Sequence, residues 1–340
     1  MDIMAANMLE RARARVWAVA AALAVVCGAA GGPVMAAGAA EHPFVPYERL
    51  PLVERSVGEL LLMESTQVRD LLTTVAIARA GRTIERRPTR EEIALYRRSL
   101  RERMGTQSEA RSRAEAPLAA IESVIPPDTS VRVGSTSVEP WRAIGQIEDY
   151  CTGTLVGPRH VLTAAHCVYD VYGQGWYPSH DFAPGRNLGI LPYGIKRWKW
   201  VVALKGYTEH DMRELDFALI VLSEDIGQQI GWIPYGWANP MPLLTVNING
   251  YPVDNRPLGS LWHADCRLAA TRPASPQRLY YDCDTAAGMS GSAIYAWFGA
   301  ADRTVYGVHA YAVDETELNG GTRITRSVFE TLEKWKTLYR

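Results

Sequence analysis

Between residues 141 and 312 the sequence repeats one pattern, in which short runs of β-branched and aromatic residues are bounded by glycine, proline or polar turn residues. Runs of this length and composition are typical of strands joined by turns. Many short strands with such turns favour an all-β barrel or sandwich. We expect strands at Trp141–Ile147, Thr154–Val156, Val161–Thr163, Trp198–Leu204, Phe217–Leu222, Leu244–Ile248, Leu279–Tyr281, Ala293–Trp297 and Val305–Ala312.

The region before these strands has a different composition. Residues 41–122 are rich in Arg and Glu, almost free of aromatic residues and without cysteine. Leucines at 60–62 and 71–72 indicate one helix, and the capping box Thr89-Arg-Glu-Glu92 begins another. The second helix has an apolar face of Ile93, Tyr96, Leu100 and Met104 and stops at Gly105. We therefore expect a separate helical region, whose interleaved acidic residues favour a solvated face over a nucleic-acid surface.

Two further segments frame the β-rich part. Residues 123–137, with Pro126-Pro127 and scattered Gly and Ser, have the composition of a linker. At the other end, Ser327-Val-Phe-Glu330 is a capping box. It precedes an apolar stripe that predicts a C-terminal helix packed on the strands, formed by Val328, Leu332, Trp335 and Leu338.

The first 36 residues have the three parts of a secretory signal: arginines at 11, 13 and 15, an apolar core from Val16 to Val26, and small residues up to Ala36. The core is short for a membrane span, although an uncleaved anchor is the alternative. We expect a secreted or periplasmic protein that has lost this segment together with Cys27. The net charge of −1 gives no indication of a polyanionic partner.

Four cysteines then remain, and an even number in an oxidising compartment predicts two disulfides. The four are Cys151, Cys167, Cys266 and Cys283. Their spacing does not choose among the three possible pairings. No Cys-x-x-Cys pair is present, so a structural zinc site is not favoured, and we expect no metal or organic cofactor.

A glycine-rich loop contains the candidate nucleophile. In Gly288-Met-Ser290-Gly-Ser292 the glycines permit a tight turn that exposes the Ser290 hydroxyl. The N–H groups of Gly288 and Ser290 would then point together at a developing oxyanion. This arrangement suits acyl transfer through a covalent intermediate.

A serine nucleophile needs a base and an orienting carboxylate. His166 in Thr-Ala-Ala-His-Cys167 is the candidate base. Asp216 begins an apolar run, where an unpaired charge would be costly to bury, so it is the candidate partner of the histidine. The three residues predict a Ser-His-Asp peptidase.

These motifs resemble the chymotrypsin-fold serine peptidases from about Arg142 to the C-terminus, and within that class the chain is similar to the bacterial glutamyl endopeptidases. The resemblance rests on the three triad motifs, Asp284-Thr285, Val308-His309 and the closing Gly321-Thr-Arg-Ile-Thr-Arg-Ser-Val-Phe-Glu330. It implies two packed antiparallel β-barrels, with His166 and Asp216 on the first and Ser290 on the second. It also implies the disulfides Cys151–Cys167 and Cys266–Cys283. From the composition we expect a signal at 1–36, a helical prosegment at 37–123 that is cleaved within the linker 123–137, and a peptidase domain at 124–340. An accessory domain that stays attached is the alternative to a prosegment.

The resemblance further assigns His309 and Thr285 to the pocket that binds the substrate side chain, and it implies cleavage after Glu. Asp284 points to an alternative, because trypsin-like enzymes place a carboxylate there for Arg or Lys. Ala310-Tyr-Ala312 also departs from the glycine usual in the family. A binding protein on an inactive protease fold is a further alternative. For the enzyme we expect polypeptide substrates, a monomer, and no nucleic-acid or, once the signal is removed, membrane partner.

Overall fold

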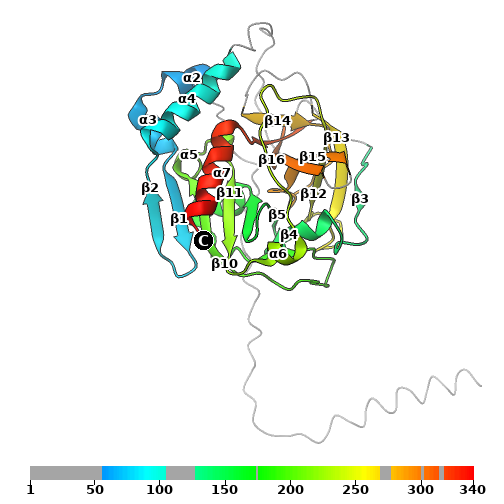
Figure 1. Ribbon diagram of the computed structural model, residues 1–340. Coiled ribbons are helices and arrows are strands. Elements are labelled where there is room, and N and C mark those ends of the chain that lie inside the picture. Colours follow the sequence, from blue (N-terminus) through cyan, green and yellow to red (C-terminus); the bar gives the residue numbers. More distant parts are fainter. Residues whose placement is uncertain (1–55, 105–126, 174, 269–276, 300–301, 314–317) are drawn as a thin grey trace, which may run out of the picture. The chain divides into compact units, whose positions relative to one another are not determined.

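Two antiparallel sheets organise the chain in the computed structural model, which describes residues 56–104, 127–173, 175–268, 277–299, 302–313 and 318–340 (Figure 1). The first sheet contains, in spatial order, β2 (Thr83–Arg86), β1 (Thr74–Ala78), β10 (Trp198–Leu204), β11 (Ala218–Leu222), β6 (His160–Thr163), β5 (Cys151–Leu155), β4 (Ile144–Ile147) and β9 (Phe182–Pro184). The predicted signal, 1–36, and the predicted 123/124 boundary lie outside the described residues.

The second sheet has seven strands, with β16 and β15 near its centre. In spatial order it contains β14 (Arg278–Tyr281), β17 (Leu318–Arg323), β16 (Asp302–Val313), β15 (Ala293–Gly299), β12 (Thr245–Gly250), β13 (Trp262–Arg267) and β3 (Val131–Arg132). A small separate hairpin is formed by β7 (Tyr169–Asp170) and β8 (Gly175–Trp176). The largest core contains buried apolar residues from both sheets, and a second core is formed by the second sheet and the loop before β15. The predominance of strands confirms the all-β prediction.

Each predicted strand is present at least in part, although Trp141–Ala143 forms a 3-10 turn before β4 and not its beginning. Several other strands were not predicted. The clearest is β17, whose sequence Leu-Asn-Gly-Gly-Thr-Arg lacks an apolar run. Its glycines are required by packing, because a Cβ at Gly321 would lie 2.2 Å from the carbonyl oxygen of Val308 on β16. Glycine at such a close approach removes the composition by which a strand is usually recognised.

The N-terminal region contains α2 (Val57–Leu62) and α3 (Ser65–Leu71) where the leucines predicted one helix, and the second predicted helix is α4 (Arg90–Met104). Helix α4 begins at the predicted capping box, in which the Glu92 N–H donates to the Thr89 hydroxyl at 3.3 Å and the Thr89 N–H donates back to the Glu92 carboxylate at 2.5 Å. The side chains of Ile93, Tyr96 and Leu100 are buried as expected.

Besides the predicted helices, this region contains two strands that join the first sheet, so it is not separate from it. Residues 74–86 form the hairpin β1–β2, and β1 pairs with β10 from Thr74 opposite Leu204 to Ala78 opposite Trp200. The charged composition of the surrounding sequence hid the short β-branched run in β1. The segment at 123–137 is also more than a linker, because β3 pairs with β13 at the edge of the second sheet.

The C-terminal helix α7 (Arg326–Leu338) packs against the first sheet. Its N-cap is Thr325, whose hydroxyl accepts the Val328 N–H, and not Ser327 as the capping-box pattern predicted. Trp335 stacks on Phe217 with ring centroids 5.4 Å apart, whereas Leu338 at the end of the predicted stripe is half exposed. The shorter helices are α5 (Lys205–Thr208) and α6 (Ile226–Ile230).

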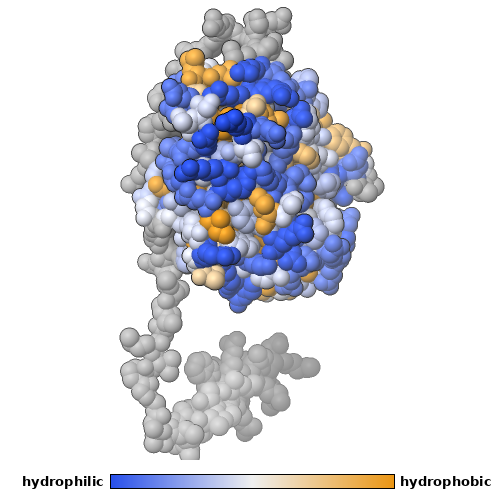
Figure 2. Space-filling model, turned by 60° about the vertical axis from the view of Figure 1, so that its left-hand side comes forward, coloured by the Kyte–Doolittle hydropathy of each residue, from blue (hydrophilic) through white to orange (hydrophobic). Residues whose placement is uncertain are grey.

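Hydrophilic residues predominate on the face shown in Figure 2, where hydrophobic residues occur in small groups. Among the described residues, no helix combines the length and apolar character needed to cross a membrane.

Candidate active site

His166 and Asp216 are brought together by the pairing of two strands in the first sheet. His166 lies in a 3-10 turn, Ala165–Cys167, directly after β6, and Asp216 lies directly before β11. Strands β6 and β11 are antiparallel neighbours, with Thr163 opposite Ala218. His166 and Asp216 therefore lie at the same end of this strand pair. Asp216 is completely buried and His166 is 9% exposed.

The Asp216 carboxylate accepts two hydrogen bonds from His166. The backbone N–H donates to Oδ1 at 3.0 Å, and the ring Nδ1 lies 2.8 Å from Oδ2. A carboxylate can only accept, so Nδ1 carries the ring proton and Nε2 is the nitrogen available as a base. The Asp216 carbonyl in turn accepts the Thr322 hydroxyl at 3.0 Å, which links this segment to β17.

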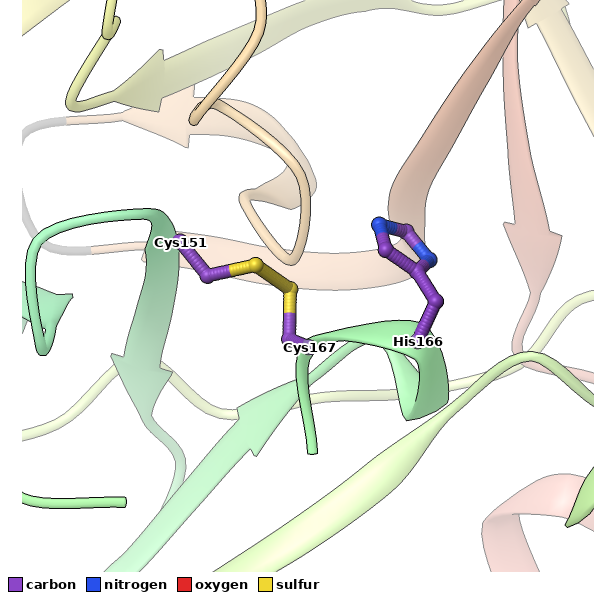
Figure 3. Close-up of side chains that lie close together, drawn as sticks. All are labelled: Cys151, His166 and Cys167. Atoms are coloured by element: carbon purple, nitrogen blue, oxygen red, sulfur yellow. A yellow bond between two sulfur atoms is a disulfide. The ribbon is translucent and has the colours of Figure 1, made fainter. Parts of the chain in front are cut away.

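The turn that holds His166 is covalently fixed. Cys167 is bonded to Cys151 on β5 (Figure 3), and a second disulfide joins Cys266 on β13 to Cys283. Both pairings implied by the family resemblance are therefore present. Closing a loop of this size stabilises a fold by about 3 kcal/mol in the loop-entropy model.

The nucleophile loop needs its two glycines. Gly288 and Gly291 have φ of 89° and 85°, which disfavours other residues. A Cβ at Gly288 would also lie 2.5 Å from the Tyr251 carbonyl oxygen, and one at Gly291 would lie 2.2 Å from the Thr152 carbonyl oxygen. The loop therefore presents Ser290, which is 7% exposed, on a turn packed tightly against neighbouring backbone.

Thr152 on β5 holds this loop from the first sheet. Its N–H donates to the Ser290 carbonyl and its hydroxyl donates to the Gly288 carbonyl, both at 2.9 Å. The Ser290 carbonyl oxygen also lies 3.5 Å from the sulfur of Cys167, the neighbour of His166. The structure thus pairs His166 with Asp216 and places the Ser290 backbone beside the residue that follows His166, while the triad assignment stays a prediction. Sequence reasoning missed Thr152, because no motif marks a threonine that binds another loop's backbone.

Several N–H groups of the loop are already used. Those of Met289, Gly291 and Ser292 donate to the carbonyls of Ala286, His309 and Met289 at 2.8–3.0 Å. Among the described residues, the Gly288 N–H makes no backbone hydrogen bond. The assignment of Gly288 and Ser290 to an oxyanion hole stays a prediction.

His309 on β16 is bound directly to the nucleophile loop. Its N–H donates to the Ser292 carbonyl, and its carbonyl accepts the Gly291 N–H, both at 2.8 Å. Thr285, at the start of the same loop, is 1% exposed. Its hydroxyl has no hydrogen-bond partner among the described residues. Both predicted specificity residues therefore belong to the surroundings of Ser290.

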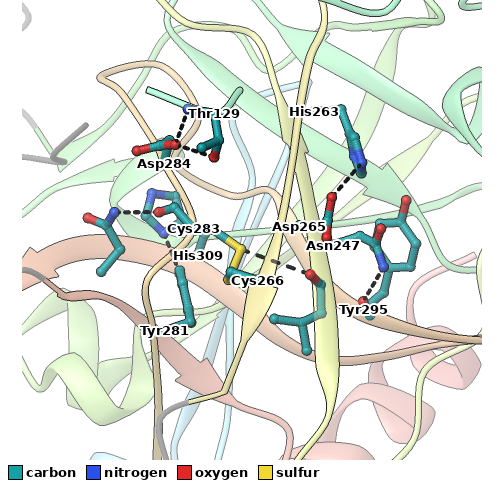
Figure 4. The surroundings of a disulfide bond; sticks show 12 residues. Thr129, Asn247, His263, Asp265, Cys266, Tyr281, Cys283, Asp284, Tyr295 and His309 are labelled. Atoms are coloured by element: carbon teal, nitrogen blue, oxygen red, sulfur yellow. Dashed lines mark hydrogen bonds and ion pairs between the residues drawn. A yellow bond between two sulfur atoms is a disulfide. The ribbon is translucent and has the colours of Figure 1, made fainter. Parts of the chain in front are cut away.

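The Asp284 carboxylate contacts Thr129, which lies just before strand β3 of the second sheet. One of its carboxylate oxygens accepts both the backbone N–H and the hydroxyl of Thr129, each at 2.7 Å (Figure 4). The residue is 2% exposed. Its negative charge is therefore compensated by donors outside the nucleophile loop, and sequence reasoning gave no signal for the contribution of Thr129.

A second acidic group lies near the triad. Burial raises the pKa of the Asp211 carboxyl, although the nearby Arg213 opposes this shift. The Tyr172 hydroxyl donates to Asp211 at 3.1 Å, and burial together with the Asp211 charge raises the Tyr172 pKa to about 12. Tyr172 therefore stays neutral and remains a donor at neutral pH.

Comparison with known proteins shows the family of this chain, and the similar proteins include those that follow. The sequence profile of the family described as Trypsin matches residues 129–326. A glutamyl endopeptidase from Bacillus licheniformis is 34% identical over 242 residues, which cover 68% of this chain and 74% of the relative. An extracellular metalloprotease from Bacillus subtilis is 33% identical over 224 residues, or 63% of this chain and 69% of the relative.

A solved structure of a Glu endopeptidase in complex with MPD matches with a TM-score of 0.58 at 27% identity, covering 63% of this chain and 99% of that one. This likeness confirms the predicted two-barrel fold.

The name of the Bacillus subtilis relative raises the question of a metal. Ligand atoms of Cys151, His166 and Cys167 lie within 4.8 Å of one another. The two sulfurs are bonded to each other and offer no thiolate, and Nδ1 of His166 donates to Asp216. These three residues therefore do not fit a metal ion. The hydrogen bond from His166 to Asp216 is instead the arrangement expected of a serine peptidase.

Proposed function

Because the chain belongs to the trypsin family of serine endopeptidases, we propose that it is a secreted enzyme that cleaves polypeptides after glutamate. The observation that carries the glutamate preference is the contact of Asp284 with Thr129. It directs the only acidic side chain expected in the specificity pocket toward two donors of another segment. His309 and Thr285 then remain as the residues that meet the substrate side chain.

In the proposed reaction the Ser290 hydroxyl attacks the peptide carbonyl and passes its proton to Nε2 of His166. Asp216 stabilises the imidazolium that forms, since its carboxylate already accepts the Nδ1–H at 2.8 Å. The N–H groups of Gly288 and Ser290 bind the oxyanion. His166 then protonates the leaving amine, and water repeats the sequence on the acyl-enzyme.

Recognition of glutamate requires donors for a carboxylate. His309 offers a ring N–H and Thr285 a hydroxyl. Trypsin-like cleavage after Arg or Lys is the alternative, and it would need Asp284 to leave Thr129 and face the substrate. A purely binding role is the other alternative, but the His166–Asp216 pair and the glycine-dependent loop would then serve no chemistry.

Peptides that differ only in the residue before the cleaved bond test this proposal. We expect the highest kcat/KM for Glu and little cleavage after Arg or Lys. His309→Ala should abolish cleavage after Glu while Ser290 still reacts with a small neutral sulfonyl fluoride. Its matched control, Asp284→Ala, should keep the preference. Cleavage after Arg that disappears in Asp284→Ala would establish the trypsin-like alternative instead.

We also propose that residues 1–36 are a signal, that 37–123 are a prosegment, and that the mature monomer begins within 123–137. The anchoring of Thr129 on Asp284 supports a cut before Thr129, because a later cut would remove this contact. N-terminal sequencing of the protein from the culture medium tests the boundary. A sequence that always starts near residue 41 would contradict it.

A further inference from the structure

The hydroxyl of Tyr281 joins three strands of the second sheet behind the proposed specificity pocket. Tyr281 is the last residue of β14 and is completely buried. Its oxygen lies 2.5 Å from Nδ1 of His309 on β16 (Figure 4) and 3.0 Å from the carbonyl oxygen of Gly320 on β17. The hydroxyl therefore has two hydrogen-bond partners but only one proton.

The donors and acceptors around the Tyr281 hydroxyl determine which atoms carry the protons. A carbonyl oxygen can only accept, so Tyr281 donates its proton to Gly320. Toward His309 the same hydroxyl must accept, and Nδ1 of the ring must therefore carry a proton. Nε2 is then the nitrogen that gains or loses a proton as the ring changes charge.

We propose that Tyr281 is a positioning residue for substrate specificity, because it holds His309 in the tautomer with the proton on Nδ1. This inference rests on the proposed role of His309 in binding the substrate side chain. In this tautomer the neutral ring presents a lone pair at Nε2, which repels a carboxylate and accepts an N–H from an amide. Only the imidazolium donates from Nε2, so glutamate binding requires a proton on that nitrogen and glutamine binding does not.

The surroundings of the His309 ring agree with this assignment. From β14 the ring faces the neutral Tyr281 hydroxyl. Of the two acidic residues that follow on the same segment, Asp282 is exposed and Asp284 is bound to Thr129. The positions of β17 beside His309 carry no side chain, since they are Gly320 and Gly321.

The test compares two peptides that are identical except for Glu or Gln before the cleaved bond, between pH 6 and 10. In the parent, the ratio of kcat/KM for Glu to that for Gln should be lower at pH 10 than at pH 6, because the neutral ring presents a lone pair to the carboxylate. In Tyr281→Phe the ratio at neutral pH should fall about 10- to 100-fold, because the imidazolium loses an acceptor. The loss should appear in KM for the Glu peptide.

Two controls separate this role from a structural one. Tyr280→Phe changes the neighbouring residue, whose side chain packs in a different cluster with Ala310 and Tyr311, and it should leave the Glu/Gln ratio within about threefold of the parent. The rate at which a small neutral sulfonyl fluoride modifies Ser290 should be equal in all three proteins.

An equal loss for both peptides in Tyr281→Phe would overturn the proposal. If Tyr281→Phe does not fold, the pH series of the parent enzyme still tests the proposal. A Glu/Gln ratio of kcat/KM that stays constant up to pH 10 would contradict the assigned tautomer. Failure of the underlying glutamate preference would be seen separately, as a parent enzyme that prefers Arg or Lys over both peptides.

Discussion

Thr152 in the first barrel donates its hydroxyl to the carbonyl oxygen of Gly288 in the second, at 2.9 Å. The same hydroxyl accepts the Tyr251 N–H at 2.9 Å, and the Thr152 N–H binds the Ser290 carbonyl. One residue of the barrel that carries His166 thus fixes two backbone groups of the loop that carries the nucleophile. We therefore expect the relative placement of the proposed base and nucleophile to depend on this contact.

Thr152→Val should therefore reduce activity, although valine and threonine have nearly the same size. The substitution leaves the Tyr251 N–H and the Gly288 carbonyl buried without their partner, which costs about 1–3 kcal/mol for each unsatisfied group. We expect a lower unfolding midpoint in urea and a fall in kcat of at least about tenfold, since small displacements of reacting groups are costly.

Thr154→Val is the matched control for this substitution. Thr154 lies on the same strand and is buried, but its hydroxyl has no hydrogen-bond partner among the described residues. Its replacement should be neutral or stabilising and should leave kcat unchanged. Equal losses of kcat in the two variants would contradict the role assigned to Thr152.

Asp284→Ala should affect stability and not specificity. The substitution removes an acceptor that Thr129 uses twice, so we expect a loss of about 1–3 kcal/mol in the free energy of unfolding. Thr129→Val removes only the hydroxyl bond and should cost less. Differential scanning calorimetry measures both, and an Asp284→Ala variant with unchanged stability would show that the Thr129 contact is absent in solution.

His180 should make the fold less stable in acid. Its ring is completely buried edge-on to Trp198, with no hydrogen-bond partner for either nitrogen among the described residues, and burial lowers its pKa to about 3. The unfolded chain binds a proton at an ordinary histidine pKa of about 6.5. The stability that the neutral, buried His180 ring gives to the fold is therefore fully present above about pH 6.5. It is lost as the pH falls toward 3, by up to about 1.4 kcal/mol per pH unit.

Urea unfolding of the parent and of His180→Leu between pH 7 and pH 4.5 measures this effect. The variant should lose less stability than the parent over that interval. Parallel pH profiles would mean that the folded protein protonates His180 as readily as the unfolded chain does.

The predicted prosegment should stay bound without a covalent link after the chain is cut within 123–128. Strand β1 pairs with β10, Lys334 of α7 lies 2.8 Å from the Glu92 carboxylate, and the Trp335 indole N–H donates to the Thr74 hydroxyl at 3.1 Å. Both fragments of the cut protein should co-elute in gel filtration and separate only in denaturant. An N-terminal fragment that elutes alone without denaturant would contradict this.

The sequence allowed the triad to be predicted because each member stands in a local pattern: a histidine before a cysteine, an aspartate before an apolar strand, and a serine between glycines. The residues that position them have no such pattern. Thr152, Thr129 and Tyr281 act through partners far away in the chain, so only the folded structure reveals them. Strand β17 was missed for a related reason, since the packing that demands its glycines removes its apolar signature.

The central claim is that Ser290 is the nucleophile of an active endopeptidase. Incubation with a peptidyl diphenyl phosphonate that carries Glu at the reactive position, followed by peptide mapping, tests it most directly. We expect one adduct, on Ser290, with labelling slowed by orders of magnitude in His166→Ala and absent in Ser290→Ala. Labelling of another residue, or undiminished labelling of Ser290→Ala, would contradict the assignment.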